Sequence, residues 1–416
     1  MNILLINHYA GSPHYGMEYR PYYMAREWVR AGHRVRIVAS AQSHVRARQP
    51  ALEGATTRLE TIDGIEYLWF SGPQYAGNGL KRVWNIMRFV ADLFLRGRDI
   101  DASFTPDVVI ASSTYPMDIW PARRIAQRAK AKLVFEVHDL WPLSPMELGG
   151  MSKWHPFIMM VAAAEGYAYR HADAVVSMLP KVRTYMESRG MPPDRLYIVP
   201  NGIDPAEWQA DSPRLQANVY ELLSGFKARG LSIVGYAGTH GVANAMDVLL
   251  DAAACIDDDR VVFVLVGGGP DKEALRQRAA AEHLSNVFFV DPVKKEQIPA
   301  LLEWFDIAYI GWHRQPLYRF GISPNKLMDY MMAARPILHA VEAGNDPVGE
   351  AGCGLTVAPE DPREIVRGIH ALLKFSVDER TAMGQRGRQF VLENHTYPVL
   401  ARRFVHAFGQ SAEARE

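Results

Sequence analysis

Two apolar runs decide the fold of this chain: Asn2-Ile-Leu-Leu-Ile-Asn7 and Arg34-Val-Arg-Ile-Val-Ala-Ser40. Both are predicted as buried strands, because an uninterrupted apolar run suits a strand that is covered on both faces. The segment from about Met17 to Ala31 between them is predicted as a helix, which Gly32 ends. A strand, a helix and a strand in this order predict a βαβ unit with a parallel sheet.

The same alternation continues along the chain in two blocks. The first block has further predicted strands at Val108–Ala111, Leu133–Val137, Ala174–Ser177 and Tyr197–Val199. The second block has predicted strands at Ser232–Tyr236, Val261–Val266, Val287–Val290 and Ile307–Ile310, with shorter ones at 336–339 and 354–357. Length agrees with this division, because 416 residues suit two or three domains of about 150 residues each.

We therefore predict an α/β fold with two doubly wound, Rossmann-like parallel-sheet domains that face a central cleft. The N-terminal domain would span residues 1–205, an irregular hinge 206–228, and the C-terminal domain 229–390. A C-terminal helix at 391–416 would pack back on the N-terminal domain. Ligands are expected at the carboxyl ends of the strands, where open α/β sheets bind them.

The composition and the charge balance limit the classes of molecule that this protein is expected to bind. Formal net charge is +0, from 46 basic and 46 acidic residues, so no global field favours nucleic acid. The two cysteines, Cys255 and Cys353, are interpreted as reduced core residues. The N-terminus lacks the basic start of a signal sequence, and no apolar run is long enough to span a membrane. A cytoplasmic protein is expected.

The segment Gly321-Ile-Ser-Pro-Asn-Lys-Leu-Met-Asp-Tyr-Met-Met-Ala-Ala-Arg-Pro336 predicts an anion site at the start of a helix. Free backbone N–H groups and the helix dipole favour anions there, and Lys326 adds a positive charge. Asp329 is one turn further on and can accept hydrogen bonds from sugar hydroxyls. With Ser323, Pro324 and Asn325 before it, the segment suits the pyrophosphate and ribose of a nucleotide-sugar.

Two glycine turns in the second block are further candidates for donor binding. Gly267, Gly268 and Gly269 follow a strand and permit close approach of a ligand to the backbone, and Lys272 can add charge. Gly238, Thr239 and Gly241 follow the first strand of this block and leave room for a phosphate or a sugar. Each turn is equally consistent with an ordinary strand-to-helix connection.

The first block contributes candidates for the acceptor. Gly11-Ser-Pro-His-Tyr-Gly16 is expected to be a flexible loop at a strand's carboxyl end, with Gly11, His14 and Gly16 as contacts. His138 and Asp139 follow a buried strand, so both side chains are expected to point into the cleft, unless they are an ordinary cap and a surface histidine. A histidine beside a carboxylate can be oriented and tuned by it.

Two further patterns are weaker. Helix 80–96 carries a polar stripe (Lys81, Asn85, Arg88, Asp92 and Arg96) opposite an apolar face (Val83, Ile86, Met87, Val90 and Leu93). This pattern predicts either a helix that packs on the core or a helix that contacts an anionic membrane peripherally. Asp99-Ile-Asp101 has the spacing of a metal-binding pair but is interpreted as a solvated loop, and no metal site is predicted.

These motifs, in this order, resemble the retaining glycosyltransferases of family 4, which have the GT-B fold. The resemblance covers nearly the whole chain and includes Val199-Pro-Asn-Gly-Ile-Asp204. The segments Pro324-Asn-Lys-Leu-Met-Asp-Tyr-Met-Met and Asp139-Leu-Trp-Pro142 look like the branch that adds N-acetylated deoxyhexosamines in bacterial surface polysaccharide synthesis, such as O-antigen or capsule.

The resemblance implies a function and roles for single residues. The chain would transfer a hexosamine-type sugar from a UDP-sugar to a lipid-linked or glycan acceptor, with retention and without a metal or cofactor. His138 would contact the donor sugar near its anomeric centre. Asp329 would be the second acid of the Glu-X7-Glu motif, which binds ribose, and the backbone at Gly267–Gly269 would line the donor pocket.

The chain departs from the family pattern at three positions. The first acid of Glu-X7-Glu falls at Gly321, and the usual arginine and lysine fall near Thr239 and Ala245. A departing pyrophosphate still needs positive charge. Lys326 is therefore predicted to supply it, with Arg319 or Lys272 as helpers.

Two other functions are consistent with the same architecture. A UDP-sugar 2-epimerase would need acids and bases around C2 and C3, and that carboxylate set is not recognised in the sequence. A non-catalytic nucleotide-sugar-binding protein would explain the missing basic residues. Epimer formation without an acceptor would identify the first, and sugar transfer would exclude the second.

Overall fold

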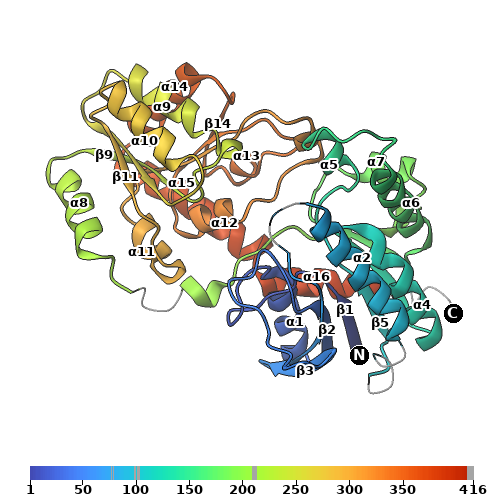
Figure 1. Ribbon diagram of the computed structural model, residues 1–416. Coiled ribbons are helices and arrows are strands. Elements are labelled where there is room, and N and C mark those ends of the chain that lie inside the picture. Colours follow the sequence, from blue (N-terminus) through green and yellow to red (C-terminus); the bar gives the residue numbers. More distant parts are fainter. Residues whose placement is uncertain (76, 78, 98–99, 101–103, 209–212, 410–416) are drawn as a thin grey trace. The chain divides into compact units, whose positions relative to one another are not determined.

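The computed structural model describes the chain apart from residues 76, 78, 98–99, 101–103, 209–212 and 410–416 (Figure 1). The chain divides into two compact units. The N-terminal unit comprises Met1–Asn201 together with Tyr397–Glu416, and the C-terminal unit comprises Gly202–Thr396. Both are α/β units, as predicted. Asp99 and Asp101 lie outside the described residues.

The N-terminal unit is built on a sheet whose described strands follow the order β3-β4-β2-β1-β5-β6-β7-β8. Neighbouring strands are parallel except β3 and β4, which are antiparallel. The strands are β1 Asn2–Ile6, β2 Arg34–Ser40, β3 Thr57–Ile62, β4 Ile65–Phe70, β5 Val108–Ala111, β6 Lys132–Val137, β7 Ala174–Ser177 and β8 Leu196–Ile198. The helices are α1 Arg20–Arg30, α2 Leu80–Leu95, α4 Ile119–Ala129, α5 Leu143–Glu147, α6 Pro156–His171, α7 Arg183–Ser188 and α16 Tyr397–Gly409.

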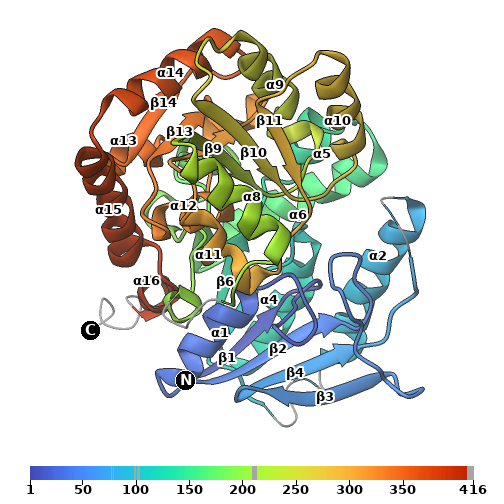
Figure 2. The same cartoon turned by 90° about the vertical axis from the view of Figure 1, so that its left-hand side faces the viewer.

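Strands β3 and β4, which were not predicted from the sequence, form a hairpin at the edge of this sheet (Figure 2). Their two-residue connection is Asp63-Gly64, and both residues have positive φ, at 50° and 79°. Asp-Gly is a preferred sequence for such a turn, because its twist matches that of the strands. The hairpin was therefore recognisable from its turn.

Helices α1 and α16 lie side by side on one face of the N-terminal sheet (Figure 1). Tyr23 of α1 stacks on Tyr397 with ring centroids 4.7 Å apart, and Trp28 meets Phe404 edge to face at 5.2 Å. Helix α16 also buries Leu400, Ala401, Ala407 and Phe408. Helix α16 is therefore part of the core of the N-terminal unit. The segment that packs back on this unit begins at Tyr397 rather than at the predicted residue 391, because α15 extends to Asn394.

The C-terminal unit has a parallel sheet whose described strands follow the order β11-β10-β9-β12-β13-β14. Its strands are β9 Ser232–Ala237, β10 Val261–Val266, β11 Val287–Val290, β12 Ile307–Gly311, β13 Ile337–Ala340 and β14 Gly354–Val357. Its helices are α8 Ala217–Ala228, α9 Met246–Cys255, α10 Lys272–Ala281, α11 Ile298–Leu302, α12 Asn325–Met332, α13 Pro347–Ala351, α14 Pro362–Lys374 and α15 Val377–Asn394. Two apolar clusters, one on each face, make this sheet doubly wound.

The predicted irregular hinge at 206–228 is wrong for its second half, which is helix α8. Val219, Leu223 and Phe226 are spaced so that they share one helical face, and all three are buried in the C-terminal unit. The interpretation of both cysteines as core residues is also wrong in part. Cys353 is buried, whereas Cys255 at the end of α9 is exposed, and both are free thiols.

Helix α2 differs from its predicted pattern. Asn85 and Asp92, which were assigned to a polar stripe, are buried, and Asn85 donates to the carbonyl of Pro73. Trp84 is 63% exposed and Leu95 is 80% exposed. The solvent face of α2 is therefore partly apolar. Among the described helices, none combines the length and hydropathy that crossing a bilayer requires.

Candidate functional site

A cavity of about 380 Å³ lies in the C-terminal unit where β9 ends and α12 begins. It unites four residues predicted for donor binding: Gly238, Thr239, Lys326 and Asp329. The remaining lining residues are Ala237, Asn244, Ile298 and Tyr330. The carboxyl end of a central parallel strand and the amino end of a helix thus share one concave surface, which suits an anionic ligand.

Lys326 is held over the cavity by Tyr236. Its Nζ lies 2.7 Å from the Tyr236 hydroxyl, 3.3 Å from Oδ1 of Asn244 and 3.9 Å from the centre of the Tyr236 ring. The Tyr236 hydroxyl donates to the carbonyl of Thr239 at 2.7 Å, so it accepts from Lys326. Burial lowers the pKa of Lys326 to about 7, against the opposing effect of Asp329. A bound diphosphate would favour the charged form.

Asp329 lies one turn further along α12 and lines the same cavity. Burial raises the pKa of its carboxyl to about 7, although Lys295 acts in the opposite direction. Among the described residues, no hydrogen-bond donor or salt-bridge partner is found for this carboxylate. It is therefore available to accept hydrogen bonds from ligand hydroxyls.

The two glycine turns are joined by backbone hydrogen bonds. Gly238 N–H donates to the carbonyl of Val266 at 2.9 Å, and His240 N–H donates to Gly268 at 2.8 Å. Gly238, Gly267 and Gly269 have φ of 156°, 149° and 150°, which favours glycine. Gly241 precedes the short 3-10 turn Val242–Asn244, beside the cavity residue Asn244.

Lys272 braces the second turn. Its Nζ donates to the carbonyls of Gly267 at 2.8 Å and Val290 at 3.1 Å, and it pairs with Asp291 at 2.8 Å. The ammonium group is therefore already bound to three oxygen atoms. Arg319, the other suggested helper, donates to the carbonyl of Pro316 and stacks over Phe320 at 4.3 Å. Lys326 is thus the predicted cation that lines the cavity.

The backbone accounts for one of the departures from the family pattern, the glycine at position 321. Gly321 has φ of 92°, a conformation that a glutamate would rarely adopt, and Ala245 has φ of 45° and is buried. After Gly321, the amide N–H of Ile322 donates to Oδ1 of Asn345 at 2.7 Å, and Asn345 returns a bond to its carbonyl at 3.1 Å. This clamp fixes the approach to α12. Ser323 and Pro324 follow half-buried, Pro324 is the N-cap, and Asn325 is exposed.

His138 follows β6 in the N-terminal unit, but its surroundings differ from those of Asp139. The imidazole is largely buried, with Nε2 at 3.0 Å from Ser112 Oγ and 3.5 Å from Glu136 Oε2. Asp139 is exposed. His138 therefore contacts Ser112, which follows β5, whereas Asp139 is exposed to solvent, and the expectation that both side chains point into the cleft stays a prediction.

The Gly11–Gly16 loop is tied down rather than flexible. Ser12 and Gly16 exchange backbone hydrogen bonds of 3.0 and 2.7 Å, and Gly11 N–H donates to Glu18 at 2.8 Å. Gly16 has φ of 98°, and a Cβ on Gly11 would lie 1.9 Å from the carbonyl of Gly16. His14 is exposed at the tip of the loop, where a partner can reach it.

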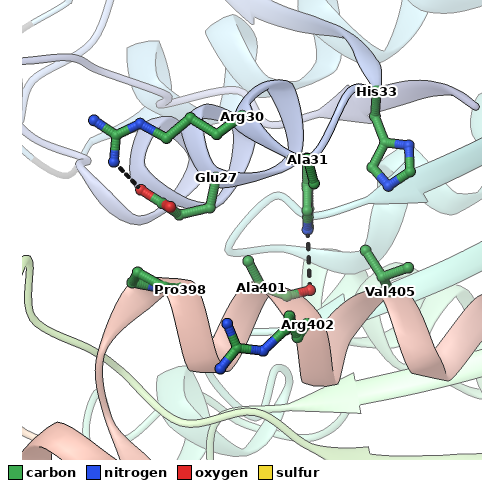
Figure 3. A pocket seen from close by; sticks show the side chains of 9 residues that line it. Glu27, Arg30, Ala31, His33, Pro398, Ala401, Arg402 and Val405 are labelled. Carbon is green, nitrogen blue, oxygen red and sulfur yellow. Dashed lines mark hydrogen bonds and ion pairs between the residues drawn. The ribbon is translucent and has the colours of Figure 1, made fainter.

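A second cavity of about 380 Å³ lies between α1 and α16 and contains none of the predicted site residues (Figure 3). Arg30 pairs with Glu27 at 2.8 Å, and Trp28 Nε1 donates to the carbonyl of Ala401 at 3.3 Å. The bottom of this cavity is formed by the packing of α1 against α16 that is described above. In the described parts of the chain, no cluster of histidine, cysteine and acidic side chains could hold a metal ion.

Comparison with known families gives a match in each unit. Residues 15–202 match the family described as "Glycosyl transferase 4-like domain". Residues 232–374 match the family described as "Glycosyl transferases group 1". The Escherichia coli K12 protein named "Putative colanic acid biosynthesis glycosyl transferase WcaI" is 23% identical over 362 residues. That alignment covers 83% of this chain and 86% of the relative.

Solved structures share the whole architecture. Sucrose-phosphate synthase from Thermosynechococcus elongatus has a TM-score of 0.70 at 14% identity, over 99% of both chains. HepE from Anabaena, in complex with UDP-glucose, has a TM-score of 0.65 at 15% identity, over 98% of this chain and 99% of its own. These likenesses confirm the GT-B fold that was predicted from the sequence.

Proposed function

Because this chain is a glycosyltransferase with the GT-B fold, we propose that it transfers a sugar from a UDP-sugar to a lipid-linked or glycan acceptor in bacterial surface polysaccharide synthesis. The cavity of Lys326 and Asp329 at the start of α12 carries the proposal. The UDP-glucose held by HepE and the naming of WcaI for colanic acid biosynthesis support it. The sugar is an N-acetylated hexosamine or deoxyhexosamine.

Each predicted residue has a role in this proposal. The diphosphate lies against Lys326 and the free N–H groups at the start of α12, after Ser323, Pro324 and Asn325. Asp329 accepts hydrogen bonds from the ribose. The turns at Gly238–Gly241 and Gly267–Gly269 admit the diphosphate and the sugar close to the backbone, and Lys272 supports the second turn. His138 contacts the donor sugar, while Gly11, His14, Gly16 and Asp139 contact the acceptor.

The reaction exchanges one bond at the anomeric carbon. The bond between this carbon and the diphosphate oxygen breaks, and the acceptor oxygen bonds to the same carbon with retained configuration. The acceptor's proton leaves with UDP. Charge grows on the diphosphate as it departs, so a preorganised cation lowers the barrier. Lys326 is that cation, and the proposed reaction uses no metal ion.

Helix α2 of the N-terminal unit makes peripheral contact with the inner face of the cytoplasmic membrane in this proposal. Lys81, Trp84, Arg88 and Leu95 are exposed and share one face of the helix. Aromatic and aliphatic side chains enter the headgroup boundary, and basic ones are attracted to anionic lipids. A lipid-linked acceptor would meet the enzyme there.

The experiment is to replace Lys326 with alanine and to measure UDP binding by calorimetry and sugar transfer with a panel of UDP-sugars. A hydrogen bond between charged groups contributes about 1.5 to 3 kcal/mol, so UDP should bind about 10- to 100-fold more weakly. Turnover should fall about 100- to 1000-fold. Lys374→Ala on the exposed face of α14 is the control and should change neither quantity.

The pH dependence of UDP binding tests the charge on Lys326. Its pKa of about 7 in the free protein means that the ammonium is lost as pH rises through 7, so affinity should fall above that pH. Lys326→Arg should remove most of this fall in affinity, and Asp329→Asn removes the second group that titrates nearby.

Near-normal turnover in Lys326→Ala would reject the role assigned to Lys326, and formation of a 2-epimer without an acceptor would favour the epimerase.

A further inference from the structure

Glu136 is a charged residue inside a buried strand, and the proposed function has given it no role. It lies on β6, among Leu133, Val134, Phe135 and Val137, and is only 3% exposed. Its Oε1 accepts from Nε of Arg20 at 2.9 Å. Its Oε2 accepts from the hydroxyl of Ser112 at 2.6 Å. The carboxylate therefore has a partner on each oxygen.

Arg20 fixes this carboxylate from the first turn of α1. Its side chain is 2% exposed, and it donates to the carbonyls of Pro200 at 2.6 Å and Val199 at 2.8 Å as well as to Glu136. Burial raises the pKa of Glu136, but Arg20 and His138 more than offset it and lower the pKa to about 2. Glu136 is therefore an anion at every working pH.

The hydrogen-bond pattern assigns the proton on His138. A serine hydroxyl has one proton, and Ser112 gives it to Glu136, so Ser112 Oγ must accept from Nε2 of His138. Glu136 Oε2, at 3.5 Å from the same nitrogen, favours a proton there. Nε2 is thus protonated in both charge states of the ring. In the described parts of the chain, Nδ1 of His138 has no hydrogen-bond partner, so this nitrogen is available to a ligand.

A contribution to folding stability does not by itself explain why Arg20 and Glu136 are buried as an ion pair. Removing two charges from water costs several kcal/mol per ion, and a close pair recovers about that amount, so an apolar pair of similar size would serve the core as well. What the pair adds is a fixed negative charge beside one nitrogen of His138.

We propose that Glu136 is a positioning residue for the transfer reaction, which acts through Ser112 and His138. It holds the proton of His138 on Nε2, fixes the plane of the ring and presents Nδ1 to the donor sugar. This inference rests on the proposed role of His138. The other charged groups that act on the ring are Arg20, in the first turn of α1, Glu18, two residues before that helix, and Asp118, from the turn before α4.

The direct test follows His138 without any need for turnover. The variant Glu136→Gln keeps the shape of the side chain and removes its charge. Long-range nitrogen NMR of the full chain, with His138→Ala used to assign the signal, reports the protonated nitrogen and the pKa. Burial lowers the pKa of His138, and Glu136 more than offsets it, so the net direction is up. The pKa should therefore fall in Glu136→Gln, and the Nε2–H form should lose its dominance.

The second readout is a double-mutant cycle on the rate of sugar transfer. Glu136→Gln should lower kcat about 10- to 100-fold, the range found when the partner that orients a metal-binding histidine is removed, with little change in KM for the donor. In the His138→Ala background the same change should have no further effect on kcat, because its target is absent. An unfolded protein would lose activity in either background.

Ser112→Ala is the companion variant, because Glu136→Gln leaves Arg20 buried opposite a neutral group and could fail to fold. Ser112→Ala keeps the ion pair of Arg20 and Glu136, removes the hydroxyl that bridges Glu136 and His138, and also removes a hydrogen bond of 3.3 Å from Asn7 Nδ2. It should also shift the Nε2–H preference and be non-additive with His138→Ala. Unchanged titration of His138 in these variants, or a full effect on kcat without His138, would overturn the inference. If the chain transfers no sugar, the NMR result still decides the role of Glu136, and the proposed function fails separately.

Discussion

Gly267 is the residue in the candidate donor site that leaves the least room for a side chain. An added Cβ would lie 1.9 Å from the carbonyl oxygen of Gly238, and φ is 149°. Gly267→Ala should therefore lower the free energy of unfolding by about 2 to 4 kcal/mol, from overpacking and backbone strain together. Urea unfolding measures this loss. UDP binding should weaken in the same variant, because the turn at Gly238 must move.

Gly241→Ala is the matched control for this change. Its added Cβ would find only ordinary contacts, the nearest at 3.8 Å to Thr239, and its φ is −146°. The control should unfold at nearly the wild-type urea concentration. Equal stability of the two variants would show that the close approach of the two turns is not a constraint.

The sequence predicted the charged members of the candidate site better than their supports. Lys326 and Asp329 were recognisable because a helix start, a lysine and an acid one turn later form a local pattern. Tyr236 and Asn244 contact Lys326 from 90 and 82 residues away along the chain, and Asn345 clamps Ile322 from 23 residues away. No local pattern encodes such contacts, because only the folded sheet brings these residues together.

Membrane contact through helix α2 can be tested with substitutions that leave the folded structure intact. Trp84 and Leu95 are mostly exposed, so replacing both with serine removes apolar surface without opening the core. Cosedimentation with phosphatidylglycerol vesicles should fall at least about tenfold, since burial of one such side chain contributes roughly 1.5 to 3 kcal/mol. Binding to neutral phosphatidylcholine vesicles should be weaker from the start, because Lys81 and Arg88 find no anionic partners there.

Leu59→Ser is the control for the helix. Leu59 is 54% exposed on β3 in the same unit and should not alter vesicle binding. If the double variant of α2 binds vesicles as well as the wild type does, the helix face is not the contact.

Secondary structure was predictable where one element carries a single, uninterrupted pattern. The buried parallel strands were found because they are continuous apolar runs. Helix α8 was missed because its three buried side chains stand among polar ones, and only their spacing marks a face. In α2, Asn85 and Asp92 are buried in hydrogen bonds and ion pairs with other residues, which a simple polar stripe does not anticipate.

The return of the chain into the N-terminal unit ties overall stability to its last helix. Phe404 is fully buried between α16 and the core and meets Trp28. Phe404→Ala should lower the free energy of unfolding of the N-terminal unit by about 3 to 5 kcal/mol. Hydrogen exchange resolves the effect by unit, and protection should fall in α1 and β2 while α9 and β10 keep theirs.

Arg402→Ala is the control in the same helix, because Arg402 is exposed and lies only two residues from Phe404. It should leave exchange unchanged in both units. Equal loss of protection in the two units after Phe404→Ala would mean that they unfold together rather than separately.

The place of α16 also sets an order of events during synthesis. A ribosome releases residues 1–201 before residues 202–396, yet the N-terminal unit lacks one of its covering helices until Tyr397–Gly409 has followed. The C-terminal unit, Gly202–Thr396, is released in between, so its whole sequence has emerged before α16 does. Of the two units, the one that is translated first is therefore completed second, and until α16 emerges the faces of Tyr23 and Trp28 that it will cover remain open to water or to a chaperone.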